Sequence, residues 1–271
     1  MTKTTIMFLI LIVFLLPYYW MLIYSLEPAT AAMDSKPRLL PKAFTLDNYL
    51  FMFRLKYFPR WVFNSIFIPM MAVILTCLSA SMAGYVLAKK DFPGSRFIFL
   101  LMITTMAIPA NTILIPRFLV MKNLRLLDTY PSMFLLFMAK PFGVFLMKQV
   151  ISTLPDEILE AAKIDGANEW QIFWKIVIPL VKPGIIALSM FTFVACYGDY
   201  FWQSLMTKTI SMRTLPLAIE YFRQGTGTTS YAPKLQLIMA AALLASLPLL
   251  ILFALFHKYF IEGPSTGSLK G

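Results

Sequence analysis

The chain has few of the residues on which catalytic and metal-binding chemistry depends. Its 271 residues include only two cysteines, Cys77 and Cys196, and one histidine, His257. Both cysteines lie inside apolar runs, where a thiol behaves as a small hydrophobic group, so the sequence offers neither a disulfide framework nor a metal-ligand spacing. We therefore expect no catalytic residue, no metal site and no cofactor bound by this chain itself.

The phosphate-binding loop of nucleotide hydrolases is also missing. No segment matches the pattern G-x-x-x-x-G-K-[S/T], so we expect that the chain does not bind ATP through such a loop. Energy from ATP would have to come from a partner protein. The net charge of +11 invites a nucleic-acid interpretation, but the basic residues are scattered and form no continuous stripe. Nucleic acid is therefore not an expected partner.

Charged residues make up only 14% of the chain, whereas hydrophobic residues make up 59%. No soluble core absorbs that much apolar surface, which indicates a protein that crosses a bilayer several times. A membrane span needs about 20 mostly apolar residues, and six runs meet this requirement. The runs are Ile6–Leu26, Trp61–Ala88, Phe97–Pro116, Pro131–Val150, Gly184–Met206 and Leu235–His257.

The six runs predict an all-α membrane protein. They are continuous and lack the two-residue alternation of outer-membrane strands, so we expect six transmembrane helices in a single domain over residues 1–271. The first run begins directly after Met1–Thr5, and a cleaved signal peptide is the competing interpretation. The length of the run and its poor cleavage site favour a retained span.

One charged, helix-patterned segment lies between the fourth and fifth runs. Thr153, followed three residues later by Asp156, matches a capping box and predicts that a helix starts there. Gly166 predicts its end, because glycine adopts the left-handed conformation without steric cost. Asn168, with Gln171 three residues later, predicts the start of a second helix. We therefore expect two short helices joined at a glycine.

Each of these two helices has apolar residues at helical spacing. The apolar face of the first is Ile158, Leu159, Ala161, Ala162 and Ile164, and that of the second is Trp170, Phe173, Trp174 and Val177. We expect Pro179 and Pro183 to end the second helix. An interfacial hairpin that only caps a helical bundle would have the same pattern, and this alternative stays open.

The letters EAAKIDGA, followed by FWKIVIPLVKP, resemble the EAA loop of permease subunits in bacterial ABC importers, and most closely those of maltose-type carbohydrate importers. Glu160, Ala161, Ala162 and Gly166 occupy the matching positions. The resemblance implies a type I importer permease whose cytoplasmic loop, residues 153–183, lies in a groove of an ATPase subunit. The residues expected to couple to the ATPase are Glu157, Glu160, Ala161, Ala162, Asp165, Gly166 and Trp170.

Three other segments resemble the same family. They are TLDNYLFMF (45–53), predicted to be a surface helix on the outer side with Asp47 near its start, GYVLAKKDFPG (84–94), predicted to end in a tight cytoplasmic turn, and the C-terminal tail (263–271). In the best-known member of the family the tail reaches between the ATPase subunits, and the resemblance raises the same hypothesis for residues 263–271. Lys and Arg are slightly more numerous on the side assigned to the cytoplasm only when the long outer loop, residues 27–60, is left out of the count, so the orientation depends mainly on the EAA loop.

The resemblance also implies a set of partners and a location. The expected partners are a second homologous permease, two ATPase subunits that hold ATP and Mg, an extracytoplasmic solute-binding protein and membrane lipid. The chain would be a non-catalytic, multi-pass subunit of the bacterial cytoplasmic (inner) membrane, with both termini in the cytoplasm.

Polar residues inside two of the predicted spans are candidates for the substrate pathway. In the third span, Asn111 lies between Pro109 and Pro116, which interrupt the helix, and broken helices commonly line transport cavities. A packing kink is the alternative. Lys140 lies in the middle of the fourth span, where a charge is costly and should face a cavity, a partner or the bundle interior.

The fifth span contributes a polar and aromatic cluster of Tyr197, Asp199 and Trp202. Hydrogen bonding combined with stacking on aromatic rings suits a sugar. The family usually has Asn at the position of Gly198, so the contacts themselves stay open. Asp199 could equally pair with another helix, including one in a partner subunit.

These observations predict the permease subunit of an ATP-driven carbohydrate importer. Because the outer loops are rich in Lys and Arg, an acidic oligosaccharide is one hypothesis for the solute, and ordinary loop charge is the alternative. An ion-coupled secondary transporter that uses Asp199 and Lys140 is a second functional hypothesis. A membrane scaffold that transports nothing is a third.

Overall fold

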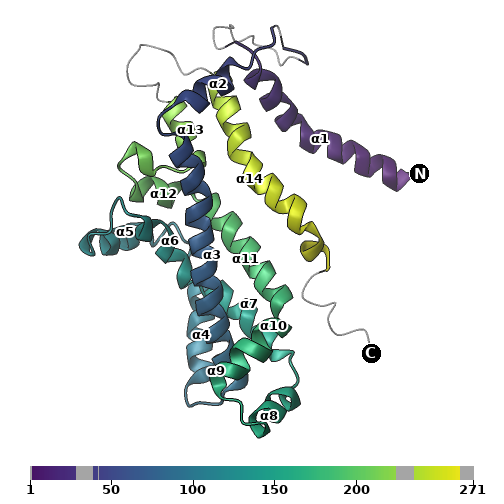
Figure 1. Ribbon diagram of the computed structural model, residues 1–271, viewed down its shortest axis with the longest axis vertical. Helices are drawn as coiled ribbons and strands as arrows, with labels where there is room; N and C mark the ends of the chain where they lie inside the picture. Colours follow the sequence, from purple (N-terminus) through teal and green to yellow (C-terminus); the bar gives the residue numbers. More distant parts are fainter. Residues whose placement is uncertain (1, 29–38, 42, 224–234, 263–271) are drawn as a thin grey trace. The chain divides into compact units, whose positions relative to one another are not determined.

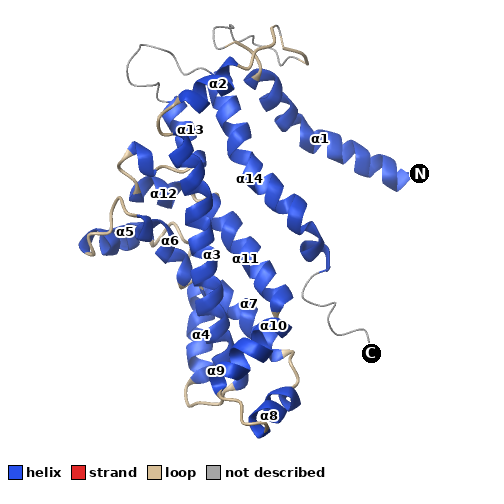
Figure 2. Cartoon of the chain, in the orientation of Figure 1, coloured by secondary structure: helices blue, strands red, loops and turns tan. Residues whose placement is uncertain are grey.

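The computed structural model describes residues 2–28, 39–41, 43–223 and 235–262, and the predicted C-terminal tail lies outside them. These residues form helices and loops without any strand, as Figure 2 shows, which confirms the all-α prediction. The elements follow one another along the chain, and Figure 1 labels α1 to α14 among them. They are α1 (Thr2–Ser25), α2 (Asp47–Arg54), α3 (Phe58–Lys89), α4 (Ser95–Met106), α5 (Leu114–Asn123), α6 (Tyr130–Met138), α7 (Pro141–Ser152), α8 (Asp156–Ile164), α9 (Glu169–Ile172), the π-helical turn η1 (Phe173–Val177), α10 (Ile178–Leu180), α11 (Lys182–Tyr197), α12 (Tyr200–Met206), the 3₁₀ turn η2 (Ile210–Met212), α13 (Leu215–Arg223) and α14 (Leu235–Glu262).

Three helices, α1, α3 and α14, are long and apolar enough to cross a membrane alone. They correspond to the first, second and sixth predicted runs. Two bent pairs of helices also qualify: α6 with α7, bent by 44°, and Glu169–Leu180 with α11, bent by 77°. The first pair occupies the fourth predicted run, and α11 followed by α12 occupies the fifth.

The third predicted run does not form one continuous helix. It begins as α4, which has 12 residues, then turns and continues as α5. Pro109 lies in the turn, where it has no N–H to donate to a helical ladder. This run is therefore divided, as are the fourth and fifth runs, whereas the first, second and sixth each form one long helix.

The chain divides into two compact units, of which the first combines Met1–Ser65 with Thr209–Ile251. In this unit, α2 confirms the predicted surface helix with Asp47 in its first turn. Trp61 is fully buried and its Nε1 donates to the carbonyl of Ile210 at 2.7 Å. The buried Asn48 donates to the carbonyls of Ser25 and Glu27 at 2.8 and 2.7 Å. Side chains therefore hydrogen-bond to backbone carbonyls at or beside the ends of other elements.

The second unit combines Ile66–Lys208 with Leu252–Gly271, and its core lies among α3, α7, α11 and the 153–183 loop. Small residues allow these helices to approach closely. A Cβ atom at Gly84 of α3 would lie 2.9 Å from the backbone nitrogen of Lys148 in α7. A Cβ atom at Gly184 of α11 would lie 2.9 Å from the side chain of Val150 in α7. Close contact through glycine is a common way to pack membrane helices.

We predict that Gly84→Leu destabilises the protein, because the new side chain meets backbone of α7 that cannot move aside. The expected cost is about 1–3 kcal/mol, typical of overpacking. Thermal unfolding of the purified transporter in detergent measures it. Met82→Leu, at an exposed position of the same helix, is the control. An equal melting temperature for both variants would contradict the close approach of α3 and α7.

Candidate functional site

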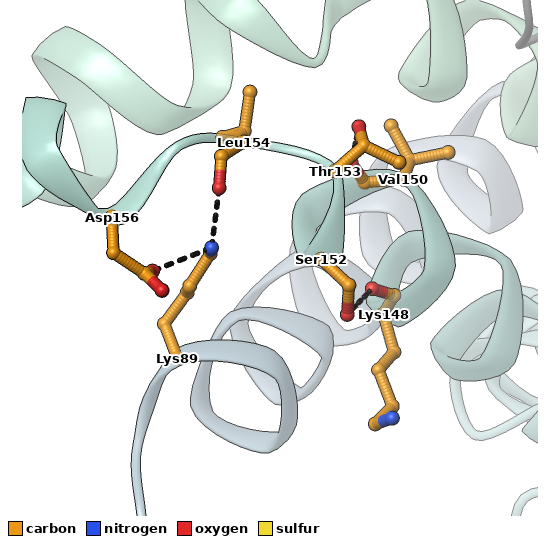
Figure 3. Close-up of polar contacts among 7 residues, drawn as sticks. All are labelled: Lys89, Lys148, Val150, Ser152, Thr153, Leu154 and Asp156. Carbon is orange, nitrogen blue, oxygen red and sulfur yellow. Dashed lines mark hydrogen bonds and ion pairs between the residues drawn. The ribbon is translucent and has the colours of Figure 1, made fainter.

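The first helix of the 153–183 loop starts later than the sequence predicts. Helix α8 begins at Asp156, after Pro155. The capping box assigned to Thr153 is wrong, because the Thr153 hydroxyl donates to the carbonyl of Val150 at 2.8 Å and belongs to the end of α7 (Figure 3). Proline disfavours a helical residue before it, so Leu154 and Pro155 separate the two helices.

The turn between the two helices is formed as predicted. Gly166 has φ +83°, the left-handed conformation that glycine adopts most readily. The N–H of Gly166 donates to the backbone carbonyl of Lys163 at 3.0 Å, and the N–H of Ala167 donates to the backbone carbonyl of Ala162 at 3.0 Å. These two hydrogen bonds form a Schellman motif. The next helix starts with the predicted capping box, in which Asn168 and Gln171 exchange hydrogen bonds of 2.8 and 2.9 Å. We call α8 to α10 the coupling hairpin.

Only part of each predicted apolar face of the coupling hairpin is buried. In α8, Leu159 and Ala162 are buried, whereas Ile164 is 86% exposed. In the second arm, Trp170 and Trp174 of the predicted apolar face are 60% and 44% exposed, so the chain itself does not cover this part of the face. The π-helical turn η1 widens this arm by one residue per turn, and the buried face moves to Ile172, Phe173 and Val177.

The predicted coupling residues therefore lie mainly on the surface. Ala162 is buried, and the other six are exposed: Glu157, Glu160, Ala161, Asp165, Gly166 and Trp170. Ile158 and Ile164 are exposed beside them. Acidic side chains thus alternate with large apolar ones on the free surface of the hairpin, and an exposed apolar patch with a polar rim is typical of a protein interaction site.

Two ion pairs, which the sequence alone did not predict, attach this hairpin to the end of α3. The ammonium of Lys89 donates to the Leu154 carbonyl at 2.5 Å and to the Asp156 carboxylate at 2.7 Å (Figure 3). Lys90 donates to the Glu169 carboxylate, which also accepts the Tyr85 hydroxyl at 2.8 Å. The hydrogen bond from Lys90, and then that from Tyr85, lowers the pKa of Glu169. The sequence showed Lys89 and Lys90 only as part of a cytoplasmic turn.

Three of the predicted pathway residues lie where helices are interrupted. Asn111 is exposed in the turn between α4 and α5. Lys140 precedes α7 at the break after α6, with its ammonium 4.1 Å from the centroid of the Phe137 ring. Asp199 caps α12 by accepting the N–H of Trp202 at 3.0 Å. Asp199 also attracts Lys140 electrostatically, so the structure brings these two charges into one region.

The two aromatic members of the predicted cluster, Tyr197 and Trp202, are buried instead. Tyr197 stacks on Phe193 with the ring centroids 5.9 Å apart. Trp202 is 1% exposed and its Nε1 donates to the carbonyl of Ser132 at 2.8 Å. Both side chains therefore support the break between α11 and α12 from within the core, and a direct contact with solute stays a prediction.

Residues 76–263 match the family described as "binding-protein-dependent transport system inner membrane component". The chain belongs to this family. It is therefore a membrane-embedded component of a transport system, in agreement with its apolar helices.

Relatives similar to this transport component align along nearly its whole length. An arabinooligosaccharides transport system permease of Halalkalibacterium halodurans is 33% identical, over 94% of this chain and 91% of the relative. The protein with the same description in Bacillus subtilis is 32% identical, over 98% and 95%. A trehalose transport system permease of Mycobacterium tuberculosis is 29% identical, over 95% and 93%.

The fold also matches a solved structure. A chain of a bacterial ABC transporter involved in the import of the acidic polysaccharide alginate superimposes with a TM-score of 0.83, at 24% identity, over 96% of this chain and 95% of that chain. The match supports the helical permease fold predicted from the sequence.

Because Trp202 is buried, we predict that Trp202→Phe lowers stability by about 1–3 kcal/mol, through a lost hydrogen bond and a small cavity. We expect the apparent KM for solute uptake to stay unchanged. Thermal unfolding and uptake by the reconstituted transporter measure the two effects. Phe201→Leu, at a neighbouring exposed position, is the control. A changed KM with unchanged stability would instead place Trp202 in contact with the solute.

Proposed function

We propose that this transport component is one of two permease subunits of a carbohydrate ABC importer. The observation that carries the proposal is the coupling hairpin, which is ordered by a Schellman turn and a capping box yet leaves Ile158, Ile164 and Trp170 exposed. A surface that is held rigidly and only half covered suits a fixed partner. The relatives named for arabinooligosaccharides and trehalose support a carbohydrate as the solute.

In this proposal the partner at the hairpin is an ATPase subunit, which holds ATP and Mg. Two such subunits would close on ATP, move the hairpins and rock the spans between inward-facing and outward-facing arrangements. The hairpin and both chain termini would then lie in the cytoplasm. The second permease would complete the pathway, and an extracytoplasmic binding protein would deliver the solute.

The solute would pass the helix breaks that carry Asn111, Lys140 and Asp199. Polar groups at interrupted helices can bond a sugar hydroxyl without leaving backbone exposed to lipid. Lys140 also lies within electrostatic range of Arg117, so positive charge gathers in this region beside Asp199. This arrangement supports acidic oligosaccharides as a solute class to test. A secondary transporter would use Asp199 and Lys140 as ion sites and the hairpin as a gate, a role that does not require the exposed apolar side chains of the hairpin.

We predict that vesicles containing the complete importer take up an oligosaccharide only when ATP and the binding protein are both present. A panel of neutral and uronate-containing oligosaccharides identifies the solute. Preferred uptake of the uronates would support the role of Lys140, and equal preference for neutral sugars would contradict it. Uptake driven by an ion gradient without ATP would overturn the ABC assignment.

We predict that Glu160→Lys and Gly166→Pro uncouple ATP hydrolysis from transport. The first reverses an exposed charge at the proposed interface. The Gly166→Pro substitution introduces a residue that cannot adopt φ +83°, and it removes the N–H that donates to the backbone carbonyl of Lys163. We expect transport per ATP hydrolysed to fall about tenfold, within the range of typical coupling energies. Gly166→Asn, which tolerates the left-handed conformation, is the matched control and should retain coupling. Unchanged coupling in Gly166→Pro would remove the assigned role of the hairpin.

A further inference from the structure

Two consecutive lysines at the end of α3 each bind a different arm of the coupling hairpin. Lys89 binds Asp156, the first residue of α8, and the carbonyl of Leu154 just before it (Figure 3). Lys90 binds Glu169, the first residue of α9. The two contacts therefore lie on opposite sides of the Gly166 turn.

The two ion pairs differ in how far they are shielded from water. The side chain of Lys89 is only 6% exposed, although that of its partner Asp156 is 73% exposed. With two acceptors, the Lys89 ammonium is held in a fixed place beneath the start of α8. The side chains of Lys90 and Glu169 are 31% and 53% exposed, and the Tyr85 hydroxyl provides Glu169 with a second contact to α3.

Formation of the two hairpin helices does not require these lysines. A carboxylate in the first turn of a helix is already stabilised by the unpaired N–H groups and the positive end of the helix dipole. Asp156 and Glu169 both occupy such positions. What the lysines add is a connection between the hairpin and a different transmembrane helix.

That connection matters because the two arms are separate helices, joined to each other by the Gly166 turn. If α3 held one arm only, the other arm could swing about Gly166 without displacing α3. With both arms held, a displacement of the hairpin must displace the end of α3 as well. Helix α3 in turn packs against α7 at Gly84, so the movement would enter the core of this unit.

We propose that Lys89 and Lys90 are positioning residues that join α3 to both arms of the coupling hairpin. Together they deliver the movement of the partner ATPase to α3, in addition to the covalent route through α7 and α11. The inference rests on the proposed function, because it assumes that an ATPase moves the hairpin.

The test compares variants of the complete importer, reconstituted in liposomes with its binding protein and solute. The double variant Lys89→Met, Lys90→Met keeps the aliphatic stems and removes both charges. We expect basal ATP hydrolysis to remain while transport per ATP hydrolysed falls about fivefold or more, the lower range of measured coupling effects. The double variant to Arg keeps both charges and should retain most of the coupling. Arg96→Met, at an exposed position at the start of α4, controls for loss of positive charge in this region.

A second comparison does not depend on the stability of the methionine variant. Lys90→Glu alone should uncouple the importer, and addition of Glu169→Lys should restore coupling by reversing the pair. Unchanged coupling in the methionine variant, equal loss in the arginine variant, or no recovery in the exchanged pair would each overturn the inference. If the unmodified importer shows no ATP-driven uptake, the proposed function itself fails, and this result is distinct from the others.

Discussion

The need to satisfy every backbone amide in a bilayer is the constraint on which this structure depends. Continuous helices meet it in α1, α3 and α14, and the broken spans must meet it by other means. At the break before α12, the Asp199 carboxylate accepts a backbone N–H, and Trp202 donates to the carbonyl of Ser132 in α6. Polar side chains in the membrane are therefore used first to make a break possible. A break held in this way also provides polar groups that a passing solute can meet.

The coupling hairpin likewise combines a backbone whose hydrogen bonds are satisfied with apolar side chains that remain exposed. Its backbone is well satisfied by the Gly166 turn and the Asn168 cap, and Leu159 and Phe173 are buried in the core of the second unit. Ile158, Ile164 and Trp170 stay exposed on the surface of the hairpin. The hairpin is thus rigid before any partner binds, which reduces the conformational entropy that binding must overcome. The lysines at the end of α3 extend this rigidity to a transmembrane helix.

The sequence predicted features that depend on local chemistry. The left-handed Gly166, the Asn168 capping box and the apolar spans follow from a few neighbouring residues, and the family resemblance followed from the same letters. Thr153 was assigned wrongly because a capping box and a helix C-terminus use the same hydroxyl, and only the preceding helix distinguishes them. The sequence did not show which part of the apolar face of the second arm is buried, because the π-helical turn η1 changes the helical spacing from Phe173 onward. The contacts of Lys89 and Lys90 join residues far apart in the chain, and a single sequence carries no signal for them.

The outward-facing Ile164, with 86% of its surface exposed, also affects how the subunit exists before assembly. A large aliphatic side chain on the aqueous side of a membrane is a site to which chaperones and proteases bind. In the proposed importer, a permease made in excess over the ATPase subunits would keep this site open. Cells that produce the subunits in unequal amounts should therefore degrade the surplus permease. Ile164 would then have two roles: it contacts the partner in the complete importer, and it marks the unassembled subunit for degradation.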